Sequence, residues 1–157
     1  MHSNAQLIQN FYEAFQRRDG AGMGACYHPE AEFSDPVFTS LKGAQVPAMW
    51  RMLTERAQTL EVNFDNVAAN DDTGQAHWEA RYLFTKTGRL VHNVIEARFA
   101  FRDGKIIRHV DSFNMWRWAG MALGIKGQAL GWLPPVQNAI RREAMSNLER
   151  YMQRRPA

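Results

Sequence analysis

Three ionisable residues with apolar neighbours are the candidates for chemistry in this chain. Asp35 ends the segment Glu32-Phe33-Ser34-Asp35 and is followed by a proline. His109 and Asp111 belong to a later strand-like run that follows an Asp-Gly turn. Ionisable groups in a hydrophobic pocket are suited to acid/base chemistry on a small molecule. We therefore predict that Asp35, His109 and Asp111 share one apolar interior and are catalytic.

The roles within this group stay open at the level of sequence. His109, Asp111 and Phe113 alternate and so lie on one face of a strand. An imidazole with a pKa near ~6.5 serves as acid or base, and Asp111 would either orient it or act as the base itself. Burial would raise the pKa of Asp35, whereas a protonated His109 would lower it. The structural alternatives are a turn acid at Asp35 and a satisfied interior histidine at position 109.

Aromatic residues on the same strands and on a preceding helix are candidates for the pocket wall. The hydroxyl of Tyr82 and the amide of Asn93 are candidates for binding a substrate carbonyl. The alternative for the aromatic residues is that they are plain core packing. The predicted substrate-binding residues are Trp50, Trp78, Tyr82, Asn93 and Phe113.

Composition restricts the class of protein. The chain has 157 residues, of which 45% are hydrophobic and 22% charged, as expected for one globular domain. We find no apolar run of ~20 residues and no secretory signal pattern, so we expect a cytoplasmic protein. The single cysteine, Cys26, excludes an internal disulfide and a Cys-rich metal site. No metal-ligand spacing, Gly-rich phosphate loop or Ser nucleophile motif is present, and we expect neither metal nor cofactor.

The net charge of +3 is distributed unevenly. Residues 114–157 carry seven Lys/Arg and two Asp/Glu, so the body of the chain is slightly acidic and we expect no nucleic-acid partner. The same region contains Trp116, Trp118 and Trp132, a mixture that also occurs at membrane surfaces. We favour instead a segment over residues 115–133 that covers the pocket mouth or forms a homodimer surface.

The order of predicted elements is typical of an α+β fold. Helices are predicted near residues 3–18, 21–27, 43–58 and 136–152, with Ser3 or Asn4 as the first cap and a break at His28-Pro29. Strands are predicted at 31–35, 60–68, 75–85, 89–102 and 105–116, with hairpin turns at 86–88 and 103–104. We predict helices packed on one face of a curved antiparallel sheet, with a domain at 1–118 and a helical extension at 119–157.

Four segments carry a resemblance to a known family. They are Phe11-Tyr12-Glu13-Ala14-Phe15 with Asp19-Gly20, Glu30-Ala31-Glu32-Phe33-Ser34-Asp35-Pro36, Lys42-Gly43, and Phe99-Ala100-Phe101-Arg102-Asp103-Gly104-Lys105-Ile106. Over residues 3–113 the chain resembles the nuclear transport factor 2-like superfamily, in the branch of SnoaL-like proteins and ketosteroid isomerase. The resemblance implies a cone-shaped α+β domain (a cystatin-like roll) with a deep pocket between helices and sheet.

The resemblance places Asp35 at the general base of ketosteroid isomerase but does not supply its oxyanion donors. The tyrosine and protonated aspartate of that enzyme correspond here to Phe11 and Ala97. Phe11 is therefore expected to contact substrate only as an apolar wall. SnoaL-like cyclases, which the chain also resembles, use a His and an Asp in this pocket without metal or cofactor.

We therefore expect a cofactor-independent acid/base enzyme of the isomerase, cyclase, dehydratase or hydrolase type. Its substrate would be a small apolar carbonyl or ring compound, and we expect the protein to be a homodimer. The alternative is a non-catalytic ligand-binding or dimerisation module of the same fold.

Overall fold

The computed structural model describes residues 1–154, which form six helices and one six-stranded sheet. The last three residues of the predicted extension, 155–157, lie outside the described residues. The strands are β1 (Tyr27–Ser34), β2 (Leu41–Lys42), β3 (Glu61–Ala69), β4 (Thr73–Phe84), β5 (Arg89–Arg102) and β6 (Lys105–Ser112). The helices are α1 (Ser3–Gln16), α2 (Gly20–Gly24), α3 (Gln45–Arg56), α4 (Met115–Leu123), α5 (Ile125–Leu130) and α6 (Pro134–Arg154).

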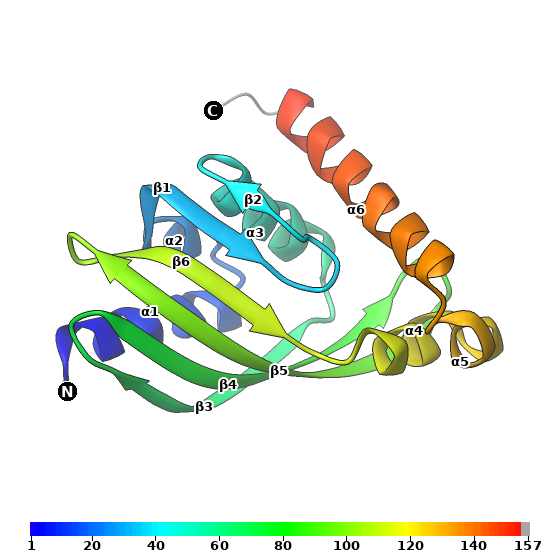
Figure 1. The fold of residues 1–157 in the computed structure, drawn as a ribbon, viewed down its shortest axis with the longest axis horizontal. Helices are drawn as coiled ribbons and strands as arrows, with labels where there is room; N and C mark the ends of the chain where they lie inside the picture. The colour runs from blue at the N-terminus through cyan, green and yellow to red at the C-terminus, as the bar shows by residue number, and fades with distance from the viewer. Residues whose placement is uncertain (155–157) are drawn as a thin grey trace.

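The sheet has the order β2-β1-β6-β5-β4-β3. Strands β3 to β6 form the predicted antiparallel meander, whereas β1 pairs with β6 in parallel. Figure 1 shows the sheet curving around the N-terminal helices, with α6 alongside α3 and with α4 and α5 at the end of the molecule farthest from the N-terminus. The predicted α+β fold, with a curved sheet around the N-terminal helices, is confirmed. The sheet is unclosed, with β2 and β3 at its two edges.

Helix α1 follows the predicted apolar stripe. Ile8, Phe11, Tyr12 and Phe15 are all buried against the concave face of the sheet. The cap, however, is His2, because its Nδ1 accepts a hydrogen bond from the backbone N–H of Asn4 at 3.0 Å. The prediction of Ser3 or Asn4 as the first cap was therefore wrong.

Two strand boundaries differ from the prediction. Strand β1 runs through His28-Pro29, where its pairing with β6 shifts register between Tyr27 and Glu32. An irregular ladder tolerates a proline because no donor is needed there. Strand β6 ends at Ser112, since the Asn114 side chain accepts from the backbone N–H of Arg117 at 2.9 Å and caps α4. The predicted boundary between residues 118 and 119 falls inside α4.

No helix among residues 1–154 combines the length and hydropathy needed to cross a bilayer.

Candidate active site

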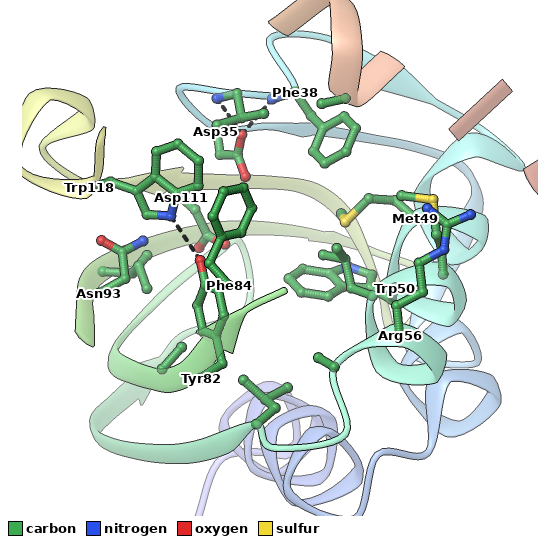
Figure 2. Close-up of a pocket in the computed structure, with 18 of the residues that line it drawn as sticks. Asp35, Phe38, Met49, Trp50, Arg56, Tyr82, Phe84, Asn93, Asp111 and Trp118 are labelled. Carbon is green, nitrogen blue, oxygen red and sulfur yellow. Dashed lines mark hydrogen bonds between the residues drawn. The ribbon is translucent and has the colours of Figure 1, made fainter. Parts of the chain in front are cut away.

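A cavity of about 410 Å³ lies between the concave face of the sheet, α3, α4 and α6. Most of its wall is apolar (Figure 2). Polar side chains enter it from the turn after β1, from β4, β5 and β6, and also from α3, the β4–β5 hairpin and α6. A space of this size accommodates a small organic molecule. Of the residues predicted from the sequence, it is lined by Asp35, Trp50, Trp78, Tyr82, Asn93, Asp111 and Phe113.

Asp35 is held at the edge of this cavity by the turn that follows β1. Its Oδ1 accepts hydrogen bonds from the backbone N–H groups of Val37 at 2.7 Å and Phe38 at 2.6 Å. Burial raises the pKa of this carboxyl to about 7; the two N–H donors oppose the shift and the charge of Asp111 adds to it. Near neutral pH, Asp35 is therefore present in both its acidic and its basic form.

Asp111 lies on β6 and contributes its carboxylate to the same cavity. Its Oδ1 accepts two hydrogen bonds, from His109 Nε2 at 2.8 Å and from Trp78 Nε1 at 3.3 Å. Among residues 1–154, no hydrogen-bond donor reaches its second oxygen. Asp111 is thus fixed through one oxygen and can offer the other to a ligand.

His109 lies behind Asp111 and outside the cavity wall. It is fully buried, and its Nδ1 is 2.7 Å from the hydroxyl of Tyr27. The Asp111 carboxylate can only accept, so His109 Nε2 carries a proton and donates it there. Nδ1 of the neutral imidazole is then the acceptor, and the Tyr27 hydroxyl, which accepts from Trp50 Nε1 at 2.9 Å, donates to it. The imidazole positions the carboxylate rather than facing the cavity.

Tyr82 and Asn93 provide neutral polar groups in the cavity. The Tyr82 hydroxyl accepts from Trp118 Nε1 at 2.8 Å, and no acceptor among the described residues takes its own proton. Burial raises the pKa of this hydroxyl. The amide of Asn93 lines the same cavity and makes no side-chain hydrogen bond within residues 1–154. Both groups are available to a ligand oxygen.

Figure 2 shows how these groups are distributed. Asp35, Tyr82, Asn93 and Asp111 gather around one part of the cavity, whereas Trp50, with Met49 and Arg56, lies across from them. These groups place two carboxyls and two neutral hydrogen-bonding groups beside a largely apolar wall. Arg56, Asn147 and the ion-paired Lys86 and Glu143 line the rest of the cavity. The arrangement can transfer protons to and from an apolar compound whose oxygen is bound by the neutral groups.

Phe11 is the predicted binding residue that the structure does not bring to the cavity. It is fully buried in the core, with its ring edge-on to Trp50 and His109 at centroid distances of 5.6 and 5.7 Å. One residue that positions the site was missed. Tyr27 was hidden by the predicted break at His28-Pro29, although its spacing from Phe33 places both on the inward face. Trp118 was predicted only as part of the segment 115–133 over the pocket mouth, and its bond to Tyr82 depends on a helix that the sequence did not predict.

The remaining histidines and acids do not make a metal site. Among residues 1–154, no group of three or more His, Cys, Asp or Glu side chains is arranged to hold a metal ion. On the outer face of the sheet, His77 and His92 are instead hydrogen-bonded to Glu79, and His77 also to Glu96. These four side chains satisfy one another away from the cavity.

The curved sheet, the enclosed helices and the apolar cavity with its carboxyl groups define the class of nuclear transport factor 2-like domains. A family model for the SnoaL-like domain matches residues 8–109. The chain belongs to this SnoaL-like family.

Solved structures agree with this fold. An NTF2-like protein from Burkholderia thailandensis is 19% identical, with a TM-score of 0.67 over 78% of this chain and 98% of that one. An LEH-like epoxide hydrolase from M. tuberculosis is 16% identical, with a TM-score of 0.65 over 82% and 96%. A candidate SnoaL-like polyketide cyclase from Jannaschia sp. CCS1 is 14% identical, with a TM-score of 0.67 over 76% and 91%. Identities this low establish the fold alone. A comparison with curated proteins gives no match.

Proposed function

We propose that the protein is an acid/base enzyme acting on a small apolar carbonyl or ring compound, of the isomerase, cyclase, dehydratase or hydrolase type. The observation that carries the proposal is that the Asp35 carboxyl lines a largely apolar cavity and has a pKa of about 7. A general acid or base works best when its pKa lies near the working pH. The similar structures include an epoxide hydrolase and a candidate cyclase, both of which fit this range of reactions.

For a carbonyl substrate, the geometry supports a simple proton-transfer step. The ionised Asp35 carboxylate takes a proton from the carbon next to the carbonyl, and the bonding electrons move to the carbonyl oxygen. The Tyr82 hydroxyl donates to the resulting enolate oxygen, as its own oxygen is occupied by Trp118. Asp35, now protonated, returns a proton to the same carbon, to the oxygen, or, where a further double bond is conjugated with the enolate, to the far carbon of that system.

The role of Asp111 differs from that of Asp35. Its Oδ1 is bound by His109 and Trp78, so it is held in one orientation while its free oxygen faces the ligand. A fixed negative charge at this place stabilises positive charge that develops on a substrate and accepts a hydrogen bond from a substrate hydroxyl or an attacking water. His109 acts through Asp111 and is a positioning residue.

The test is hydrogen exchange with solvent. The protein is incubated in D₂O with apolar cyclic ketones from 2-tetralone upward in size, and deuterium uptake is followed by mass spectrometry. We expect exchange above background, reduced about 100-fold in Asp35→Asn and to a similar degree in Tyr82→Phe. Asp72→Asn, an equal change at an exposed residue outside the cavity, is the matched control. Apolar epoxides, with diol formation as the readout, extend the assay to hydrolysis.

The alternative function is ligand binding without turnover. It is supported by the residues at the two positions where the resemblance would place oxyanion donors, since Phe11 and Ala97 are both buried and apolar. Native mass spectrometry of the gently purified protein distinguishes the two. A stoichiometric bound compound that neither exchanges protons nor is converted would favour binding and contradict the enzymatic proposal.

A further inference from the structure

Exposed apolar side chains gather at one end of the molecule. Among residues 1–154, all the large hydrophobic side chains that are exposed, apart from Met1, come from the end of the β4–β5 hairpin and from the α4–α5 region. Figure 1 shows these elements together, away from the N-terminus. The residues are Leu83, Leu90, Trp116, Ile125, Leu130 and Trp132. A cluster of exposed apolar side chains on a protein surface marks an interaction site.

Four of these residues belong to one small helical unit, which we call the α4–α5 patch: Trp116, Ile125, Leu130 and Trp132. Helix α5 has six residues and is therefore only about 9 Å long. The Trp116 indole N–H donates to the carbonyl of Gln128 at 3.0 Å, and that of Trp132 donates to the carbonyl of Ala129 at 3.0 Å. Because both indoles are already satisfied, their exposed rings can enter an apolar medium without losing a hydrogen bond.

The charged residues within the segment that forms this patch all have one sign. Between residues 112 and 142 the chain contains no Asp or Glu. Arg117 and Lys126 belong to the patch region, and Arg89 reaches it from β5, where its Nε donates to the carbonyl of Met121 at 2.8 Å. Arg89 and Arg117 also line a shallow surface hollow of about 380 Å³ beside Trp116. The patch is therefore complementary to an anionic surface.

A second copy of the chain fits this charge pattern less well than lipid does. Homodimers are built from the same patch on both subunits, so a symmetric contact here would bring the arginines and the lysine of one copy onto those of the other. Exposed tryptophans, exposed aliphatic side chains and flanking cations are, in combination, what anionic membrane surfaces attract.

We propose that the α4–α5 patch docks on an anionic lipid surface. Trp116 and Trp132 lie at the level of the headgroups, Ile125 and Leu130 enter the boundary of the acyl chains, and the cations bind lipid phosphates. The prediction from sequence favoured a lid or a dimer surface for this whole region. The structure separates these roles, because Trp118 lines the cavity whereas Trp116, Ile125 and Trp132 are half or more exposed.

Docking at this end would also place the cavity beside the bilayer. Phe84 and Lys86 of the hairpin and Trp118 of α4 all line the cavity. An apolar compound dissolved in the membrane could then reach the site without crossing water. This consequence rests on the proposed function, whereas the lipid binding itself does not.

Vesicle flotation tests the proposal with the full chain. We expect the protein to float with phosphatidylcholine vesicles that contain phosphatidylglycerol, and not with phosphatidylcholine alone. The double variant Arg117→Glu, Lys126→Glu should lower the binding constant more than tenfold, since each cation near an anionic surface contributes roughly fivefold. Arg102→Glu, Arg108→Glu makes the same change in net charge at exposed residues of β5 and β6 outside the patch and should bind like the wild type.

Two further measurements keep the proposal falsifiable if a variant fails to fold. Brominated lipids should quench the tryptophan fluorescence of the wild-type protein, with no substitution required. Absence of flotation and quenching overturns the proposal, and so does an equal loss of binding in both charge variants. A wild-type dimer that Ile125→Asp converts to a monomer in sedimentation equilibrium would assign the patch to a second copy and also overturn it. None of these outcomes depends on catalytic activity.

Discussion

The indole of Trp118 donates a hydrogen bond to the hydroxyl of Tyr82 at 2.8 Å, across the gap between α4 and β4. The Tyr82 oxygen accepts this bond, so the hydroxyl proton can be donated to a ligand in the cavity. The region beyond the matched family domain, which ends at residue 109, thereby orients a polar group of the candidate active site.

Removal of the Tyr82 hydroxyl should destabilise the protein through its partner. In Tyr82→Phe the nearly buried Trp118 N–H loses its acceptor, which costs about 1–3 kcal/mol of unfolding free energy. The double variant Tyr82→Phe, Trp118→Phe should lose less than the sum of the two single variants, as measured by urea unfolding. Trp116→Phe removes a comparable indole bond at a half-exposed ring and should cost less than Trp118→Phe. Strict additivity of the two cavity variants would contradict the coupling.

The raised pKa of Asp35 predicts how stability depends on pH. The folded state binds the proton with a pKa of about 7, above the ordinary value of an unfolded Asp near ~3.9, so ionisation disfavours the folded state. Protonated Asp35 makes its full contribution to the free energy of unfolding below about pH 4. That contribution is lost as the pH rises to about 7. Three pKa units correspond to about 4 kcal/mol, and solvent reaching this half-buried carboxyl reduces the effect to about 1–3 kcal/mol.

Asp35→Asn isolates this effect. The amide oxygen can still accept from Val37 and Phe38, but the side chain no longer ionises. Between pH 4.5 and 8 the variant should gain about 1–3 kcal/mol of unfolding free energy relative to the wild type. Asp72→Asn, at an exposed position, should show a difference that stays flat across the same range. Parallel curves for the wild type and Asp35→Asn would exclude a raised pKa.

The bonds around His109 predict a single tautomer. Because the Asp111 carboxylate can only accept, the imidazole proton lies on Nε2, and Tyr27, which accepts from Trp50, donates to His109 Nδ1. Long-range ¹H–¹⁵N NMR spectra should show a protonated Nε2 and an unprotonated Nδ1 at pH 7. In Tyr27→Phe the Trp50 N–H and His109 Nδ1 both lose their partner, and the protein should lose about 2–4 kcal/mol of stability. A protonated Nδ1 in the wild type would reverse the proposed direction of the chain.

The sequence predicted the parts of the site that follow simple periodicity. Alternation along β4, β5 and β6 correctly placed Tyr82, Asn93 and Asp111 on the inward face, and the Asp-Pro step placed Asp35 at the end of β1. The sequence could not show that Asp111 lines the cavity and His109 does not. Residues two positions apart on a strand lie on the same face, whether they reach the cavity or pack in the core beside it.

The rest depends on contacts between distant segments. The pairing of β1 with β6 in parallel, which brings Tyr27 to His109, joins residues 82 positions apart and leaves no local pattern. The end of β6 could not be predicted either. The run of aromatic residues after Ser112 suits a strand, but Asn114 caps a helix that begins within it. The Asn114 cap and the burial of Trp118, Ala119 and Ala122 against the rest of the chain outweigh the local strand propensity there.

The close packing of α5 on α4 predicts a strict requirement for glycine at position 127. A Cβ atom at this position would lie 1.9 Å from the carbonyl oxygen of Ala119, which is backbone and cannot move aside without displacing α4. Gly127→Ala should therefore separate the two helices, cost about 1–3 kcal/mol of unfolding free energy and expose the segment to proteolysis, despite the higher helix propensity of alanine. Lys126→Ala, on the exposed face of the same short helix, should leave stability within about 0.5 kcal/mol of the wild type. Because α4 also carries Trp118, the alanine variant should disturb the Tyr82 hydroxyl as well, which tyrosine-labelled NMR spectra would detect; unchanged proteolysis and an unchanged Tyr82 signal would show that α5 is not packed in this way.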